Sequence, residues 1–143
     1  MILVDVNVLV YAHREDAEDH TAYRDWLMGV VNGRPAYGMA DLVLSGFLRV
    51  VTHPRVFDPP SPLRDALSFV QTLREQSHCV RVEPGPRHWE IFRNLCQSVG
   101  ARGNLIPDAY LAAFAIETGS QWITTDRDFS RFPELDWRHP LEG

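Results

Sequence analysis

The chain has 143 residues, of which 45% are hydrophobic and 23% are charged, and its formal net charge is −5. This composition is ordinary for a globular protein and argues against a disordered chain. The acidic balance argues against a protein that coats nucleic acid through a basic face. It does not exclude an enzyme acting on nucleic acid, because bound cations would invert the charge of an acidic site.

The length suits a single domain spanning residues 1–143. No stretch reaches the roughly 20 apolar residues that cross a bilayer, and the N-terminus lacks the basic start and cleavage site of a signal peptide. We therefore expect a cytoplasmic protein without a membrane partner. The two cysteines form no CxxC pair and the six histidines no HExxH motif, so any metal would be held by oxygen ligands.

The N-terminal stretch combines an apolar run with polar residues. Residues 2–4 predict a buried strand, and Asp5 follows at its carboxyl end, where ligands bind in α/β proteins. Asn7 follows two positions after Asp5, and a short helix is expected over residues 8–14. Asp5 or Asn7 could instead only cap that helix, a role for which both residue types are preferred. The choice depends on whether other carboxylates converge on Asp5.

The next segments predict a helix, a strand and a second helix. An apolar stripe at helical spacing marks the first helix, and the strand is expected at residues 36–39. Residues 41–52 are apolar nearly all round a helical wheel, so this helix must be buried on several sides. A central core helix and an interface with another chain explain this equally well. Gly46 is unfavourable inside a helix and suggests a close backbone approach.

The second half continues the alternation. Ser61 is expected to cap a helix that has Pro62 in its first turn. Further elements are expected as follows: a strand at 79–83, a helix at 89–99, a helix from 106 to 118, a strand at 121–125, a helical turn at 129–132 and an edge strand at 135–138. Alternating strands and helices indicate an α/β fold with a parallel sheet and helices on both faces.

A parallel sheet gathers acidic residues at one edge. The carboxyl ends of its strands bring Asp5 and Asp126 to the same side. Asp108, in the first turn of a helix, joins them only if that helix begins at the same edge. Each acid has a structural explanation, since Asp108 suits a helix dipole, and Asp126 and Asp128 suit a turn that caps a helix. Together they are harder to explain by capping alone.

Clustered carboxylates repel one another unless a cation compensates their charge. Mg²⁺ takes oxygen ligands in octahedral geometry and is often held by carboxylates and substrate phosphate. Such a site can lower the pKa of a bound water and stabilise the attacking and leaving oxygens of a phosphoryl displacement. Phosphodiester hydrolysis is the matching chemistry.

Three segments carry a family resemblance: Val-Asp-Val-Asn-Val-Leu at 4–9, Asn-Leu-Ile-Pro-Asp-Ala-Tyr-Leu-Ala-Ala at 104–113, and Thr-Thr-Asp-Arg-Asp-Phe at 124–129. Their order and spacing resemble PIN-domain ribonucleases, and over the whole length the chain resembles VapC-type toxins of toxin-antitoxin systems. The resemblance implies a three-layer α/β/α sandwich with a parallel sheet of four or five strands. It also implies a Mg²⁺- or Mn²⁺-dependent endoribonuclease that cleaves structured RNA, often tRNA or rRNA, and a VapB-type antitoxin partner.

The resemblance also assigns roles to residues. The metal-binding acids would be Asp5, Asp108 and Asp126, with Asp128 as a further catalytic acid, and the supporting residues would be Asn7 and Thr125. One departure concerns the helix at 41–52, where many family members carry a Glu and this chain has Gly46. That missing acid puts a two-metal mechanism in doubt, but not the fold.

Partners and alternatives follow from the same residues. The candidate RNA contacts are Arg14, Arg49, Arg102 and Arg127, although a solvated surface arginine is the commoner case. The apolar helix at 41–52 suggests a homodimer. The main alternative is a weakened PIN fold that binds antitoxin or RNA without cleavage. A phosphatase of the haloacid dehalogenase type would need Asp where Asn7 stands.

Overall fold

The computed structural model describes residues 1–142, and Gly143, the last residue of the predicted domain, lies outside them. Its centre is a five-stranded, fully parallel sheet in the order β3-β2-β1-β4-β5. The strands are β1 (Ile2–Val4), β2 (Tyr37–Ala40), β3 (Cys79–Val82), β4 (Gln121–Ile123) and β5 (Trp137–Arg138). The predicted parallel α/β sheet is thereby confirmed.

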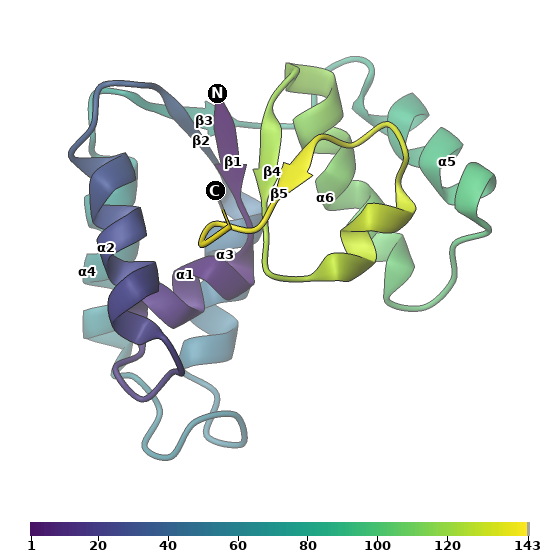
Figure 1. The fold of residues 1–143 in the computed structure, drawn as a ribbon. Coiled ribbons are helices and arrows are strands. Elements are labelled where there is room, and N and C mark those ends of the chain that lie inside the picture. The colour runs from purple at the N-terminus through teal and green to yellow at the C-terminus, as the bar shows by residue number, and fades with distance from the viewer. Residues whose placement is uncertain (143) are drawn as a thin grey trace.

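Helices cover both faces of the sheet (Figure 1). On one side lie α1 (Val6–His13), α2 (His20–Val31), α3 (Asp41–Val51) and α4 (Leu63–Arg74), and on the other lie α5 (His88–Val99) and α6 (Leu105–Thr118). Right-handed crossovers explain the division, because the chain moves outward from β1 to β3 and then returns across the sheet to β4. A short 3₁₀ helix, η1 (Arg127–Arg131), follows β4. This arrangement is the predicted three-layer sandwich.

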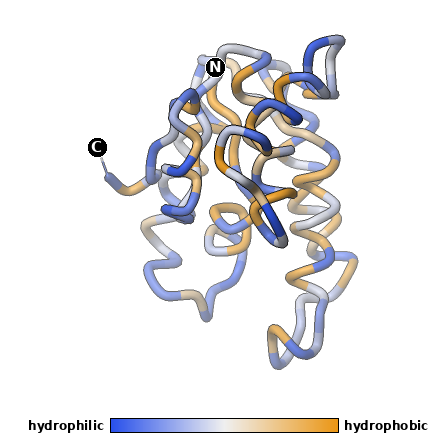
Figure 2. Tube along the Cα trace, turned by 90° about the vertical axis from the view of Figure 1, so that its right-hand side faces the viewer, coloured by the Kyte–Doolittle hydropathy of each residue, from blue (hydrophilic) through white to orange (hydrophobic). Residues whose placement is uncertain are grey.

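The core lies between the sheet and these helices. Leu3, Val4 and Ile123 of the central strands are buried. Hydrophobic residues run through the interior of the trace, and hydrophilic residues gather in the outer loops (Figure 2). None of the helices in residues 1–142 combines the length and apolarity of a membrane span.

Small residues let α6 pack closely. Its buried residues are Ala109, Ala112, Ala113, Phe114 and Ala115. The alanines add little bulk, so the helix backbone can approach both α5 and the sheet. Gly119 ends the helix in the left-handed conformation, as expected of a glycine at that position. Asp108, in the first turn of α6, is therefore carried by a tightly held helix.

The start of α4 differs from the prediction. Its N-terminal flanking residue is Pro62, and no side chain caps the helix. The Ser61 hydroxyl instead hydrogen-bonds His13 Nε2 at 3.1 Å and accepts from Arg14 Nη1 at 3.2 Å. The prediction of Ser61 as a cap was wrong because this hydroxyl joins the end of α1 to the segment before α4.

Helix α3 is amphipathic in the isolated chain. Val43, Leu44, Phe47 and Val51 are buried, whereas Leu42 is 52% exposed. The predicted core role therefore applies to one side of the helix. The other side leaves an apolar residue in contact with solvent.

Candidate active site

Strands β1 and β4 lie side by side in the middle of the sheet. Their register pairs Val4 with Ile123, the last residues of the two strands. The chain adds β2 and β3 on one side of β1, and β4 and β5 on the other side. The boundary between β1 and β4 is therefore the topological switch point, where α/β proteins bind ligands. Asp5 and Thr124, the next residues along the chain, consequently meet at one edge.

Asp5 is buried at this edge, with 5% of its surface exposed. One carboxylate oxygen, Oδ1, accepts the backbone N–H of Val6 at 2.7 Å, so Asp5 caps α1. The other oxygen, Oδ2, accepts from Thr124 Oγ1 at 2.8 Å and from Asn7 Nδ2 at 3.2 Å. The capping interpretation is thus correct, and this set of hydrogen bonds also fixes the carboxylate in one orientation.

Asn7 joins the two strand ends. Its Nδ2 donates to Asp5, and its Oδ1 accepts the backbone N–H of Thr125 at 3.2 Å. The fully buried Thr124 hydroxyl donates to Asp5 and accepts the backbone N–H of Asp126 at 3.0 Å. Of the two threonines, Thr125 contributes only backbone to this network, and Thr124 contributes the side chain.

Asp126 and Asp128 follow β4 directly. Asp126 caps η1, with its Oδ1 accepting the backbone N–H of Asp128 at 2.9 Å. The predicted capping turn is therefore present. Asp126 is half-buried and Asp128 is exposed, so the pair runs from the buried edge of the sheet toward solvent.

Helix α6 begins at the same edge of the sheet, since Pro107 and Val6 line one pocket and the charges of Asp126, Asp5 and Asp128 act on Asp108. The pKa of Asp108 is raised to about 6, mainly by burial and in addition by the charges of Asp126, Asp5 and Asp128. The pKa of Asp5 is likewise raised to about 6. Burial is the largest cause, hydrogen bonds from Thr124, Val6 and Asn7 oppose the increase, and the charge of Asp126 adds to it. The acids that the sequence singled out therefore lie near enough for their charges to raise the pKa values of Asp5 and Asp108.

Comparison with known proteins identifies the family. The PIN domain family model matches residues 2–135. The chain belongs to the PIN-domain family. Among curated relatives, "VapC ribonuclease Mb2897" of Mycobacterium bovis is 49% identical over 143 residues, covering 100% of this chain and 97% of its own. "Ribonuclease VapC25" of Mycobacterium tuberculosis is 42% identical over 135 residues, covering 94% of this chain and 95% of its own.

Solved structures share the PIN fold at low sequence identity. VapBC2 from Rickettsia felis, bound to a DNA fragment from its promoter, superposes with a TM-score of 0.71 at 17% identity and covers 97% of this chain and 98% of that chain. Mycobacterium tuberculosis VapC20, described as a Sarcin-Ricin loop cleaving toxin, gives a TM-score of 0.68 at 14% identity, covering 91% of this chain and 93% of that chain. These likenesses confirm the three-layer fold of the PIN domain.

Within the described residues, the candidate acids of this PIN domain form no ion pair with a cationic side chain. None of the ion pairs within residues 1–142 includes Asp5, Asp108, Asp126 or Asp128. Burial, and in addition their mutual charges, raise the pKa values of Asp5 and Asp108. Within residues 1–142, no three His, Cys, Asp or Glu side chains already lie close enough to hold one ion together. Uncompensated oxygen donors fit a hard divalent cation, which would draw them together and offset their repulsion.

The candidate arginines of the PIN domain differ in their surroundings. Arg14 is held by Asp16 at 2.7 Å and lies 4.2 Å from the Phe57 ring centroid, at the far end of α1 from Asp5. Arg127 pairs with Glu142. Arg49 and Arg102 are exposed and form no ion pair within residues 1–142. Among the four candidates, these two are the ones whose guanidinium groups are outside any ion pair in the described part of the chain.

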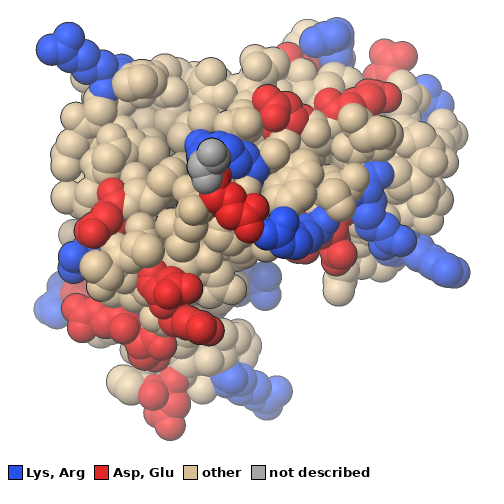
Figure 3. Space-filling view, viewed as in Figure 1, with Lys and Arg blue, Asp and Glu red and all other residues tan. Residues whose placement is uncertain are grey.

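The surface charge of the PIN domain is mixed. In Figure 3, acidic side chains gather at the lower left, over the end of α1 and the start of α2, and basic side chains are scattered among neutral ones. This view shows no broad basic face, in agreement with the net charge of −5.

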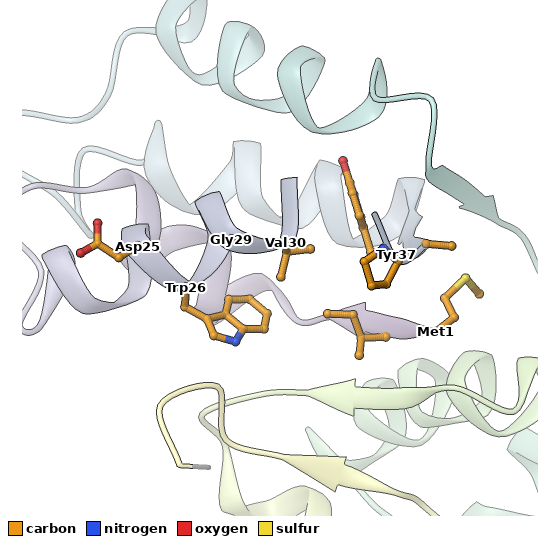
Figure 4. A pocket seen from close by; sticks show the side chains of 9 residues that line it. Met1, Asp25, Trp26, Gly29, Val30 and Tyr37 are labelled. Carbon is orange, nitrogen blue, oxygen red and sulfur yellow. The ribbon is translucent and has the colours of Figure 1, made fainter. Parts of the chain in front are cut away.

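A mostly apolar cavity of about 640 Å³ lies away from the acids of the PIN domain. Figure 4 shows the side chains of Trp26 and Val30 from α2 around it, together with Met1 and Tyr37. Met1 precedes β1 and Tyr37 opens β2, so this cavity lies at the amino ends of the strands. It is therefore at the opposite edge of the sheet from Asp5.

Thr124 is the residue that sequence reasoning missed. Because it follows the apolar strand β4 and precedes Asp126 by two positions, a buried hydroxyl at the strand end was a readable signal. Which of two adjacent threonines points inward depends on the exact end of the strand, and the expected strand ran two residues too far.

Proposed function

We propose that this PIN domain is a metal-dependent endoribonuclease toxin of a VapBC-type system, silenced by a VapB-type antitoxin. The observation that carries the proposal is the set of uncompensated carboxylates at the topological switch point. The full-length VapC ribonuclease relatives and the VapBC complexes among the structural neighbours support it. Structured RNA is the proposed substrate class.

The proposed metal ligands are Asp5, Asp108 and Asp126, with Asp128 as a further acid and Asn7 and Thr125 in support. Mg²⁺ or Mn²⁺ would supply a water of lowered pKa and neutralise charge on the phosphate. Asp5 is suited to this role because Thr124, Asn7 and the Val6 N–H hold its carboxylate in one orientation. Asp108 approaches from α6, across the edge from Asp5.

The chain's own residues prepare the site in other ways. The buried Thr124 hydroxyl couples Asp5 to the backbone of Asp126, so the two strand ends keep a fixed relation. The exposed Asp128 lies at the solvent side, where substrate enters. Arg49 and Arg102 are the proposed phosphate contacts, and Arg14 is a weaker candidate because Asp16 already holds it.

The test is cleavage of total cellular RNA by the purified chain, freed of antitoxin, with Mg²⁺ or Mn²⁺. We expect cleavage by the unaltered protein and a loss of at least about 100-fold in Asp5→Asn and in Asp108→Asn. Asp65→Asn is the matched control, since Asp65 is an exposed acid of α4 paired with its neighbour Arg64. Equal cleavage by all variants, or no cleavage by the unaltered chain, would contradict the proposal.

A second candidate function is a binding module that holds antitoxin or RNA without cleavage. It is favoured by Gly46, which stands where many family members carry an acid. Calorimetry separates the two functions. Heat of Mg²⁺ or Mn²⁺ binding that disappears in Asp108→Asn supports the nuclease, whereas retained RNA affinity without any metal binding supports the module.

We further propose one domain over residues 1–143 and a homodimer. The family match over residues 2–135 supports the first. The exposed Leu42 on α3 supports the second. Sedimentation velocity of the antitoxin-free chain measures the mass directly.

A further inference from the structure

The C-terminal turn lies at the same edge of the sheet as the candidate acids. Strand β5 runs parallel to β4, with Arg138 opposite Ile123, so the chain leaves both strands at their shared carboxyl edge. In Figure 1 the yellow C-terminal segment passes the end of β4 from which the chain continues to η1. The turn at residues 139–142 is therefore a neighbour of the segment that carries Asp126 and Asp128.

Arg127 stands between these two acids in the sequence, but within residues 1–142 it forms an ion pair with neither. The Asp126 carboxylate accepts the backbone N–H of Asp128 at 2.9 Å, which fixes the backbone on both sides of Arg127. The Arg127 guanidinium instead pairs with the Glu142 carboxylate of the C-terminal turn. A cation that adjoins two candidate acids is thus occupied by an anion of the chain itself.

The C-terminal turn has other contacts that hold it in place. The backbone N–H of Glu142 donates to His139 O at 3.2 Å, and the backbone N–H of Leu141 donates to His139 Nδ1 at 3.1 Å. Pro140, between them, is buried. Because these contacts do not involve the Glu142 carboxylate, the turn keeps them when that carboxylate leaves Arg127.

The ion pair itself is weak enough to be exchanged. Both side chains are exposed, Arg127 to 63% and Glu142 to 59%. Water and salt screen such a pair, so it adds little to stability. A phosphate binds a guanidinium through two parallel hydrogen bonds. A phosphate that arrives at Arg127 therefore replaces the carboxylate, which returns to water at little cost.

We propose that Arg127 is a phosphate contact of the substrate RNA, and that Glu142 occupies its guanidinium until the RNA phosphate displaces it. The proposal rests on the nuclease function proposed above. Because Arg127 adjoins Asp126 and Asp128, the phosphate that it binds lies beside the proposed metal site. Glu142 is then an internal competitor that lowers the affinity for RNA.

The first experiment measures the affinity for a fluorescein-labelled RNA hairpin by anisotropy, in EDTA so that metal-dependent cleavage does not occur. Loss of an exposed ion pair corresponds to about threefold in an equilibrium constant, so Kd should fall by about that factor in Glu142→Gln. Arg127→Gln should raise Kd. It should also flatten the slope of log Kd against log salt by about 0.7 to 0.9, the contribution of one phosphate.

Glu134→Gln is the matched control. Glu134 is an exposed acid in the segment before β5, and it forms no ion pair within residues 1–142. Its substitution removes the same charge as Glu142→Gln, so Kd should stay unchanged. An equal gain in affinity from both substitutions would mean that net charge alone is responsible, which overturns the proposal.

The double variant Arg127→Gln with Glu142→Gln tests whether Glu142 acts through Arg127. Without the guanidinium there is nothing for the carboxylate to occupy, so adding Glu142→Gln to Arg127→Gln should leave Kd almost unchanged. A threefold gain in both backgrounds would show that Glu142 repels RNA independently of Arg127. That result, or an unchanged salt slope in Arg127→Gln, overturns the proposal.

Cleavage of total cellular RNA with Mg²⁺ by the unaltered chain separates the two proposals. The expected changes in Kd without any cleavage overturn the nuclease and leave the phosphate contact standing. Cleavage together with a Kd that none of the variants changes overturns the phosphate contact and leaves the nuclease standing. A chain that does not bind the hairpin in EDTA also overturns the phosphate contact.

Discussion

Asp5 has two roles whose demands conflict. As the cap of α1 it must be close to the helix backbone, and burial there raises its pKa to about 6. As a proposed ligand it must be ionised. Hydrogen bonds from Thr124, Val6 and Asn7 favour the charged form, and a bound cation would complete the compensation.

Asp108 should make metal-free stability depend on pH. Its pKa of about 6 in the folded chain lies above the ordinary 3.8, so ionisation costs more when folded than when unfolded. The cost is absent below pH 3.8, grows as the pH rises, and is complete above pH 6. In EDTA, Asp108→Asn should therefore be more stable than the unaltered chain by about 1 kcal/mol at pH 7.5, after allowing for solvent screening.

Urea unfolding of both proteins at pH 4 and pH 7.5 measures this difference. The advantage of Asp108→Asn should be mostly lost at pH 4, where the carboxyl is protonated in the folded chain and close to half protonated in the unfolded chain. An advantage of equal size at both pH values would point to packing instead of charge.

Thr124→Val should impair the site without changing its shape. The substitution keeps the side-chain volume but removes the hydroxyl that donates to Asp5 and accepts from Asp126 N–H. Losing such a supporting hydrogen bond costs about 10- to 100-fold in metal affinity or activity. The pKa of Asp5 should also rise, because that hydrogen bond favours the carboxylate.

The measurement is the pH profile of kcat/KM, whose acidic limb should move to higher pH. Thr52→Val is the matched control, since the Thr52 hydroxyl bonds only Leu48 O at the end of α3. A uniform loss with an unmoved acidic limb would mean that Thr124 does not act through Asp5.

The residues of the site were predictable to different degrees. Asp5, Asp108 and Asp126 could be found because each stands at a strand end or helix start. The sequence indicates a hydroxyl at the end of β4, but it does not tell which of Thr124 and Thr125 faces inward, because this depends on where β4 ends to within one residue. Contacts such as Arg14 with Asp16 and Phe57 depend on loop geometry, which the pattern of apolar residues does not encode.

At the scale of elements, helix α6 both packs in the core and carries a proposed metal ligand. Ala112 and Ala113 are fully buried, and the same helix carries Asp108 in its first turn. Any change that pushes α6 outward would therefore also displace a proposed ligand.

Ala112→Leu tests this connection. Overpacking of a close contact costs about 1 to 3 kcal/mol, so the free energy of unfolding should fall by that amount. Ala22→Leu, on the exposed side of α2, should change it by less than about 0.5 kcal/mol. Urea titration gives both values, and a neutral Ala112→Leu would mean that α6 has room on its inner face.

Helices were predicted well where regularly spaced apolar residues continue over many positions. The ends of helices and strands were predicted poorly. The helices now bounded by His88–Val99 and Leu105–Thr118 follow from their apolar spacing and closing glycines. Helix α1 begins two residues before the expected start, because Asp5 and not Asn7 is the cap. The start of α4 was misjudged because the Ser61 hydroxyl has a distant partner, which local sequence cannot indicate.

At the scale of the whole molecule, the strand order decides where chemistry occurs. Placing β1 between β2 and β4 creates a single switch point, and the candidate acids lie there. Right-handed crossovers then place the helices before and after β3 on opposite faces, whereas the alternation of strands and helices does not by itself determine the strand order. The parallel sheet was predictable from this alternation, whereas the cavities between helices were not.

Binding of Mg²⁺ should stabilise the whole fold. A ligand that binds only the folded chain raises its stability, by about 2.7 kcal/mol at 100 times Kd. At pH 7.5, Mg²⁺ should raise the Tm of the unaltered chain and leave the Tm of a double variant, Asp5→Asn with Asp108→Asn, unchanged. Thermal scans in EDTA and in Mg²⁺ test this, and an equal rise in both proteins would place the ion elsewhere.

The hydrogen bond between Thr124 and Asp5 joins residues 119 positions apart in the chain. A ribosome therefore makes the first proposed ligand early and its partners, Asp126 and Asp128, close to the end of synthesis. Until those last strands emerge, β1 has no β4 beside it and the acids cannot assemble. A nascent or prematurely terminated chain consequently lacks the complete set of proposed ligands, and the proposed site can form only when synthesis is nearly complete.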